Sequence, residues 1–170
     1  MARKQLLIAL GIFAAMIVTL AAAWAGLGNA PVDEVSTAER LALAARWLLV
    51  PALCLMVGVG AAASRRFLSA AMIDGARSSD DPVFDINLRY NLNTVEQLCL
   101  AAIAWIGLVL VLALPARDLS LIPVLAGLFA AGRFTFWVGY LAAPWARAFG
   151  MAVTLLPTAA ALVWLSVQAI

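Results

Sequence analysis

The sequence predicts an all-α membrane protein, a bundle of helices that crosses the bilayer several times. Of its 170 residues, 66% are hydrophobic and 12% are charged, and the mean hydropathy is +1.04. A soluble domain is about half apolar and about a quarter charged. The chain also contains several apolar runs near the roughly 20 residues that a helix needs to cross the hydrocarbon layer. We therefore expect an integral protein of the lipid bilayer.

The composition argues against several classes of function. The chain has no histidine, so it lacks the usual side chain for acid–base catalysis and the commonest metal ligand. The net charge is only +2, and no basic patch is interleaved with aromatic residues, so no nucleic-acid partner is expected. Cys54 and Cys99 lie in separate apolar runs without CxxC spacing. They are expected to be small core residues, and no metal site is expected.

The apolar run Leu6–Leu27 follows a basic start that contains Arg3 and Lys4. The run is longer than the roughly 7–15 residues of a signal-peptide core and matches a bilayer span. We interpret it as a retained transmembrane helix. Cleavage is the alternative, because the small residues around Trp24 resemble a signal-peptide cleavage site.

Four more apolar runs predict the remaining spans: Leu41–Ala63, Tyr90–Leu114, Leu121–Ala143 and Phe149–Ile170. Before them, Ser36 or Thr37 can cap a helix with Glu39 close behind, an imperfect capping box. In the next run, Gly58, Gly60 and Ala62 predict a small-residue packing surface. These patterns divide the chain into an extra N-terminal helix with its connection, residues 1–40, and a four-helix membrane domain, residues 41–170.

Basic residues predict the orientation of the five spans. A cytoplasmic N-terminus places most of them on the cytoplasmic side: Arg3, Lys4, Arg65, Arg66, Arg77, Arg89 and Arg147. The opposite side receives Arg40 and Arg117, together with Arg46, which can extend outward from its span. The positive-inside rule therefore predicts a cytoplasmic N-terminus.

Polar residues form a stripe at the start of the span Tyr90–Leu114. Arg89, Asn93 and Glu96 have the spacing i, i+4 and i+7, which places them on one face of a helix. Because ionised groups inside a bilayer are costly, such groups face a protein interior or a wet cavity. The stripe therefore predicts a polar binding site.

The cations expected near this stripe are Arg65, Arg66, Arg89, Arg133 and Arg147. Glu96 is the obvious partner for an amine, so an anionic small molecule with one amino group would suit the cluster. Arginine also binds carboxylates in a bidentate manner, and a nearby guanidinium would stabilise a bound thiolate.

Two blocks of sequence resemble a known family. The blocks are Arg89-x3-Asn93-x2-Glu96-Gln97, preceded by Asp81-Pro82-x-Phe84, and Arg133-x5-Gly139-Tyr140-x6-Arg147. Their order and spacing resemble the MAPEG superfamily, the membrane-associated proteins of eicosanoid and glutathione metabolism, in its prokaryotic form. The resemblance covers roughly Leu41–Ile170 and suggests a bacterial inner-membrane location.

The resemblance implies a MAPEG-like four-helix bundle and a homotrimer with glutathione, used as a co-substrate, bound between subunits. The residues that match glutathione-binding positions are Arg89, Asn93, Glu96, Arg133, Tyr140 and either Arg65 or Arg66. Arg147 matches the arginine thought to stabilise the glutathione thiolate in the leukotriene synthase branch, which makes it the catalytic candidate. Phe136, Gln97 and the extra helix depart from the eicosanoid-making members and argue against eicosanoid synthesis.

The functional hypothesis is a glutathione-dependent transferase or peroxidase that acts on a lipophilic electrophile from the bilayer. One alternative is a non-catalytic protein of the same fold, a structural or lipid-binding trimer. Arg89 and Arg147 would then be interfacial anchors, Asn93 would join helices, and Glu96 would form a structural ion pair with Arg89 or Arg133. A small transporter is disfavoured, because the two halves show no inverted repeat.

Overall fold

The computed structural model describes residues 2–28, 34–69, 72, 81–111 and 114–168. These residues form helices and no strand, which confirms the all-α prediction. The helices are α1 (Ala2–Gly26), α2 (Thr37–Phe67), α3 (Pro82–Leu110), α4 (Leu121–Ala142) and α5 (Ala148–Gln168). A 3₁₀ turn, Ala116–Asp118, precedes α4.

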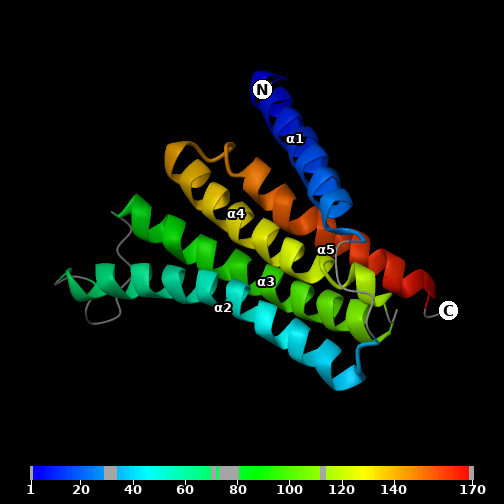
Figure 1. The fold of residues 1–170 in the computed structure, drawn as a ribbon. Coiled ribbons are helices and arrows are strands. Elements are labelled where there is room, and N and C mark those ends of the chain that lie inside the picture. Colours follow the sequence, from blue (N-terminus) through cyan, green and yellow to red (C-terminus); the bar gives the residue numbers. More distant parts are fainter. Residues whose placement is uncertain (1, 29–33, 70–71, 73–80, 112–113, 169–170) are drawn as a thin grey trace.

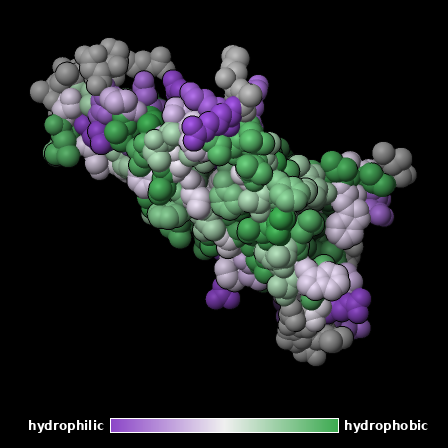
Figure 2. All heavy atoms as spheres, turned by 90° about the horizontal axis from the view of Figure 1, so that it is seen from above, coloured by the Kyte–Doolittle hydropathy of each residue, from purple (hydrophilic) through white to green (hydrophobic). Residues whose placement is uncertain are grey.

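All five α-helices are long and apolar enough to cross a membrane. Figure 2 shows hydrophobic atoms over most of the central body, with hydrophilic residues gathered toward the ends. A body of this kind buries apolar side chains in lipid and leaves its polar ends in water. The protein is a multi-pass integral membrane protein.

Helices α2 to α5 form a bundle, and α1 lies against its outside. In Figure 1, α2 to α5 run side by side, whereas α1 crosses them at an angle. Helix α2 packs chiefly on α3, and α4 packs on α5, while α2–α4 and α3–α5 contacts join the two pairs. Helix α1 packs on α5 and, less extensively, on α4.

Two helix starts differ from the sequence prediction. Ser36 caps α2 and forms a complete capping box with Glu39, not an imperfect one, because Glu39 falls at the third helical position. Helix α3 begins at Pro82, not near Tyr90. Asp81 Oδ1 accepts hydrogen bonds from the backbone N–H groups of Val83 and Phe84, and this cap starts the helix before the apolar run begins.

Glycines allow two close helix contacts. A Cβ on Gly150 of α5 would overlap the backbone of Phe136 in α4, and one on Gly58 of α2 would overlap Tyr90 of α3. The sequence predicts the same role for Gly60, but a Cβ at this position would meet open space. It lies about 200° around the helix from Gly58 and so faces away.

Helix α1 is attached through small residues and through one polar end. Ala15 is buried against Leu128 and Ala152, and Gly26 lies directly beside Val124. At the C-terminal end of α1, Ser120 Oγ donates to the Gly26 carbonyl. These contacts fix the end of α1 to the start of α4.

Candidate functional site

The polar stripe lies on α3, about two turns deeper in the helix than the sequence predicts. Because α3 begins at Pro82, Arg89 comes two turns after its start, and Glu96 is near its middle. Arg89 and Glu96 are exposed, and Asn93 is half-buried. The three residues therefore line an outward face of the single chain.

Asn93 connects the stripe to the interior of the bundle. Its Oδ1 accepts a hydrogen bond of 2.6 Å from Arg133 Nη1, and its Nδ2 donates to Glu96 Oε2 at 3.4 Å. Arg133 lies behind the stripe and is 0% exposed. Asn93 therefore separates the buried cation from the exposed carboxylate.

Arg133 is held by neutral groups. Its Nη2 donates to Thr154 Oγ1 of α5 at 2.6 Å, and its guanidinium lies 4.7 Å from the centre of the Phe136 ring. Within the described residues it forms no ion pair, and its Nε has no hydrogen-bond partner. The structure thus places an uncompensated positive charge inside the bundle, which is normally costly in a membrane.

Arg89 and Arg147 meet at one tyrosine. Arg89 Nη1 donates to the Tyr140 hydroxyl at 3.1 Å, and the Arg147 guanidinium lies over the Tyr140 ring, 4.4 Å from its centre. Tyr140 itself is buried at the end of α4, whereas both arginines are exposed. A cation over a ring face and a cation at the hydroxyl bring two positive charges to the same spot.

Three exposed charged groups lie at this site: Arg89, Glu96 and Arg147. None of them forms an ion pair with a described residue. The two ion pairs among the described residues are Arg65–Asp81 and Arg117–Asp118. Within a single chain, Glu96 therefore forms no ion pair with Arg89 or Arg133. Asp85, one turn before Arg89, attracts that guanidinium without forming an ion pair.

Arg65 and Arg66 have different surroundings, although the sequence could not distinguish them. Arg65 Nη1 binds Asp81 Oδ2 at 2.6 Å, so it joins the end of α2 to the cap of α3. Arg66 is exposed, and its guanidinium lies over the Phe84 ring at 5.3 Å. Hydrogen bonds from the Phe84 N–H and then Arg65 hold the pKa of Asp81 below its usual value, against the opposing effect of burial.

Sequence reasoning missed two polar residues around this site, Thr154 and Asn87, and noted Gln97 only for its difference from the eicosanoid-making members. Thr154 receives Arg133, as described above. Asn87 is buried and accepts a hydrogen bond of 2.9 Å from Trp137 Nε1, which joins α3 to α4. Gln97 is buried with its Oε1 unpartnered. Asn87 lies on the buried face of α3, at the i, i+7 and i+10 spacing of Thr94 and Gln97, and that spacing is the signal that could have indicated it.

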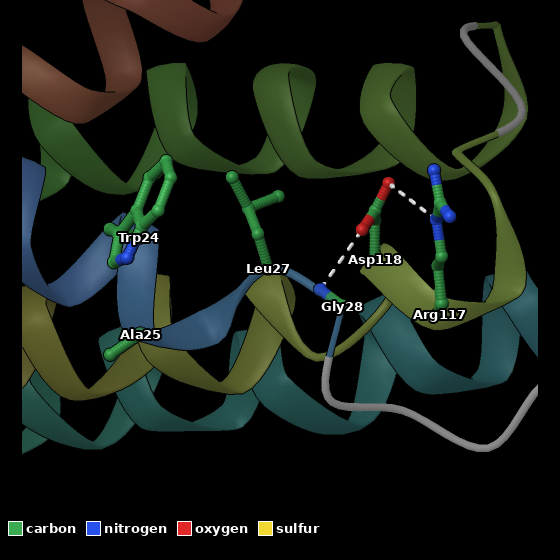
Figure 3. Close-up of a pocket in the computed structure, with 6 residues that line it drawn as sticks. All are labelled: Trp24, Ala25, Leu27, Gly28, Arg117 and Asp118. Carbon is green, nitrogen blue, oxygen red and sulfur yellow. Dashed lines mark hydrogen bonds and ion pairs between the residues drawn. The ribbon is translucent and has the colours of Figure 1, made fainter.

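A cavity lies at the opposite end of α4 from Tyr140 and contains none of the predicted site residues. It has a volume of about 720 Å³ and is lined by Trp24, Ala25, Leu27, Gly28, Arg117 and Asp118. Figure 3 shows Asp118 between Gly28 and Arg117, and its Oδ1 accepts from the Gly28 N–H at 3.1 Å. Asp118 already accepts a hydrogen bond from Gly28 and pairs with Arg117. These structural contacts account for the charged groups in the cavity.

No group of three or more cysteine, aspartate or glutamate side chains in the described ranges could hold a metal ion. Both cysteines are free. The polar groups at the stripe end of the bundle are thus guanidinium, carboxylate, amide and phenol groups. This set suits an organic anion.

Comparison with known proteins assigns the chain to a family. The model of the MAPEG family matches residues 41–167. The chain belongs to the MAPEG family. The matched range includes nearly all of α2 to α5 and leaves α1 outside.

The match to a curated relative is short. Transmembrane protein 79 of Mus musculus is 43% identical over 51 residues, which are 30% of this chain and 13% of that protein. This MAPEG-family chain therefore spans only a small part of that relative. No solved structure matches the chain.

Proposed function

We propose that this MAPEG-family protein is a glutathione-dependent enzyme that conjugates or reduces lipophilic electrophiles within the membrane. The observation that carries the proposal is the meeting of Arg89 and Arg147 at Tyr140, with Glu96 two turns further along α3. Two cations and one carboxylate are thus available to a ligand from one end of the bundle. None of them is engaged in an ion pair with a described residue.

The charges of glutathione fit this arrangement. The tripeptide has two carboxylates, one ammonium group and one thiol. Arg89 can bind a carboxylate, and Glu96 can accept the ammonium group. Asn93 is already bonded to Arg133 and Glu96, so its role is to orient the carboxylate of Glu96.

Arg147 is the residue that we assign to the chemistry. Glutathione supplies a thiol that becomes nucleophilic when it loses its proton. A thiol with a pKa of about 8.5 needs a shift of about one to two units to ionise well at neutral pH, which corresponds to about 1.4–2.7 kcal/mol. One guanidinium held in place over Tyr140 can supply this amount.

Other predicted site residues receive more specific roles. Arg133 is enclosed, so we assign it to positioning Asn93 and not to contact with glutathione. Of the two arginines at the end of α2, Arg65 is occupied by Asp81. Arg66 is therefore the one we propose as a ligand contact, and Tyr140 positions Arg89 and Arg147.

A homotrimer would complete the site. The face of α3 that carries Glu96 also exposes large apolar side chains, including Leu92 at 65% and Ile103 at 63%. A neighbouring subunit on this face would cover these side chains and exclude water from the charged groups, which strengthens their interactions. We also propose a cytoplasmic N-terminus in a bacterial inner membrane, because this orientation gives cytosolic glutathione access to Arg89 and Arg147.

The test is glutathione binding to the detergent-purified, full-length protein, by calorimetry and thermal shift. A ligand that binds only the folded state adds about 2.7 kcal/mol of stability at a hundredfold excess over its Kd. Glu96→Ala and Arg89→Ala are the test variants. Arg46→Ala is the matched control, because it removes an exposed arginine from the first part of α2.

Stabilisation of the parent and of Arg46→Ala, but not of the two test variants, would place the ligand on α3. Turnover of a lipophilic electrophile that Arg147→Ala abolishes without loss of binding would then identify the catalytic arginine. Absence of binding at millimolar glutathione would overturn the proposal and favour a non-catalytic trimer of the same fold.

A further inference from the structure

The cavity at the C-terminal end of α1 lies at one surface of the membrane. Its walls come from the end of α1 and from the 3₁₀ turn that precedes α4. This end of α1 reaches the start of α4 in Figure 1, and the Ser120 side chain joins the two helices there. Because α1 and α4 are both long and apolar enough to cross a membrane, the cavity lies where hydrocarbon gives way to lipid head groups.

One wall of the cavity carries an exposed tryptophan beside a leucine. Trp24 is 82% exposed and Leu27 is 44% exposed, and Figure 3 shows the two side chains next to each other on the end of α1. Tryptophan is enriched at the membrane surface because its ring is apolar and its N–H is polar. This wall therefore suits the glycerol region of a lipid, where the acyl chains meet the head group.

The other wall carries a cation and an anion in fixed positions. Asp118 Oδ1 accepts a hydrogen bond of 3.1 Å from the Gly28 N–H, and Asp118 Oδ2 lies 4.0 Å from Arg117 Nε. These contacts explain where the two charged groups lie, but they use few of the N–H donors of the guanidinium and few of the acceptor sites of the carboxylate. The Arg117 side chain is also 65% exposed. Both groups can therefore bind a ligand without leaving their places.

We propose that the cavity binds the head group of a phospholipid that has a phosphate and a primary ammonium group, phosphatidylethanolamine. Arg117 donates hydrogen bonds to the phosphate oxygens, a pairing that suits the planar guanidinium. Asp118 Oδ2 accepts a hydrogen bond from the ammonium group. The Trp24 ring packs against the glycerol region, and the acyl chains extend into the bilayer beside α1.

The balance of charge selects this head group. Arg117 and Asp118 are the charged residues in the described lining of the cavity, so their charges sum to zero. A zwitterion leaves the site neutral, whereas phosphatidylglycerol would add a negative charge beside an arginine that is already paired with Asp118. Phosphatidylcholine has no ammonium hydrogen to donate to Asp118. The cavity volume of about 720 Å³ is within the roughly 300–1,000 Å³ of small-molecule sites.

The lipid site is independent of the proposed function. It lies at the end of α4 away from Tyr140, and Trp24 and Gly28 are outside residues 41–167, which match the family model. A bound lipid would contact α1 at Trp24 and the turn before α4 at Arg117. It would thereby add to the contacts that hold α1 on the bundle, and it needs no glutathione.

Lipid titration of the full-length protein in a mild detergent tests the proposal. Phosphatidylethanolamine, phosphatidylcholine and phosphatidylglycerol with the same acyl chains are added separately, and native mass spectrometry measures the affinity for each. We expect one phosphatidylethanolamine per chain to bind about tenfold more tightly than phosphatidylglycerol, with phosphatidylcholine between them, since one charged hydrogen bond is worth about this factor. Soluble phosphoethanolamine should not displace the lipid, because it lacks the part that contacts Trp24.

Two variants and a matched control test the contacts. Arg117→Gln should weaken phosphatidylethanolamine binding about tenfold, and Trp24→Leu should weaken it about threefold. Both side chains are largely exposed, so neither change should alter folding. Trp164→Leu is the control, because Trp164 is an exposed tryptophan near the C-terminal end of α5, on the same side of the bundle. It should leave the affinity unchanged.

Asp118→Asn tests whether the balance of charge selects the lipid. Asparagine keeps an oxygen acceptor for the Gly28 N–H and removes the negative charge, so the preference should change from phosphatidylethanolamine to phosphatidylglycerol. An unchanged order of preference in this variant would overturn the proposal.

Two other results would also overturn it. Equal affinity of the parent for phosphatidylethanolamine and phosphatidylglycerol, or an equal loss in Trp24→Leu and Trp164→Leu, would reduce Trp24 and Arg117 to general interfacial anchors. Displacement of the lipid by soluble phosphoethanolamine would assign the cavity to a free phosphoamine instead.

Discussion

Arg133 donates a hydrogen bond of 2.6 Å to Asn93, and this bond links the interior of the bundle to its outward polar face. Arg133 is the one charged residue that is fully buried in the described part of the chain. An amide, a hydroxyl and two ring faces surround it in place of a carboxylate. The stability of the bundle and the geometry of the stripe therefore depend on the same side chain.

Substitution of Asn93 tests this dependence. Asn93→Ala leaves a buried guanidinium N–H without an acceptor, so we expect a loss of about 1–3 kcal/mol of unfolding free energy. Asn93→Asp should restore most of the loss, because a carboxylate can accept the same bond and balance the charge. Thermal unfolding in detergent measures both variants. Leu92→Ala, on the exposed face of α3, is the control, and an equal loss in that variant would contradict the prediction.

Gly150→Ala tests the close contact between α4 and α5. The new Cβ would overlap the Phe136 backbone, and overpacking of this kind costs about 1–3 kcal/mol. Gly60→Ala is the matched control. Its Cβ meets open space, so that variant should gain up to about 1 kcal/mol from helix propensity. Chemical unfolding that gives both variants the same sign of change would disprove the assignment of these two glycines.

Tyr140 should act on ligand binding in two separable ways. Tyr140→Phe removes the hydrogen bond to Arg89 and keeps the ring beneath Arg147, so we expect glutathione affinity to fall by up to about tenfold. Tyr140→Leu also removes the cation–π contact and should reduce the rate of turnover as well. Calorimetry measures the affinity, and electrophile conjugation measures the rate. Identical effects of the two variants would show that the ring has no role of its own.

The lowered pKa of Asp81 predicts that the folded protein loses stability in acid. Because this pKa is lowered in the folded protein, the contribution of Asp81 is present above the ordinary aspartate pKa of about 3.9 and is lost as the pH falls through the lower, folded value. Asp81→Asn should therefore unfold at a lower temperature than the parent at neutral pH, and the difference should shrink below about pH 4.

The variant Arg65→Gln distinguishes the causes of that shift. The backbone N–H of Phe84 is the largest single cause of the lowered Asp81 pKa, and the Arg65 side chain adds a hydrogen bond and a charge. Arg65→Gln should consequently keep part of the acid-dependent change. A pH profile of Arg65→Gln as flat as that of Asp81→Asn would assign the effect to the ion pair instead.

The sequence predicted the spans well because apolar length determines them. Helix α4 begins at Leu121, as expected, and ends within one residue of the prediction. The structure begins α3 earlier than apolar length predicts, since the first two turns of this helix contain the polar residues Asp85 and Asn87. The cap at Asp81 starts this helix, and a cap is a local hydrogen-bond feature that hydropathy does not record.

The site was predicted less completely than the fold. Helical spacing correctly placed Arg89, Asn93 and Glu96 on one face of α3. It could not show that Arg133 turns inward to Thr154, because that contact depends on how closely Gly132 and Gly150 let α4 approach α5. The choice between Arg65 and Arg66 likewise depended on the fold of α2 against α3.

The way α1 is attached affects how easily this helix could be lost or exchanged during evolution. In lipid, removing a docked helix exposes Ala15, Leu128 and Ala152 to hydrocarbon and not to water, so it forfeits contact but little hydrophobic free energy. The polar contacts at the end of α1 include the hydrogen bonds of Gly28 with Asp118 and of Gly26 with Ser120. We therefore expect that loss of α1, or its replacement by a helix from another chain, would leave the packing of the other four helices intact.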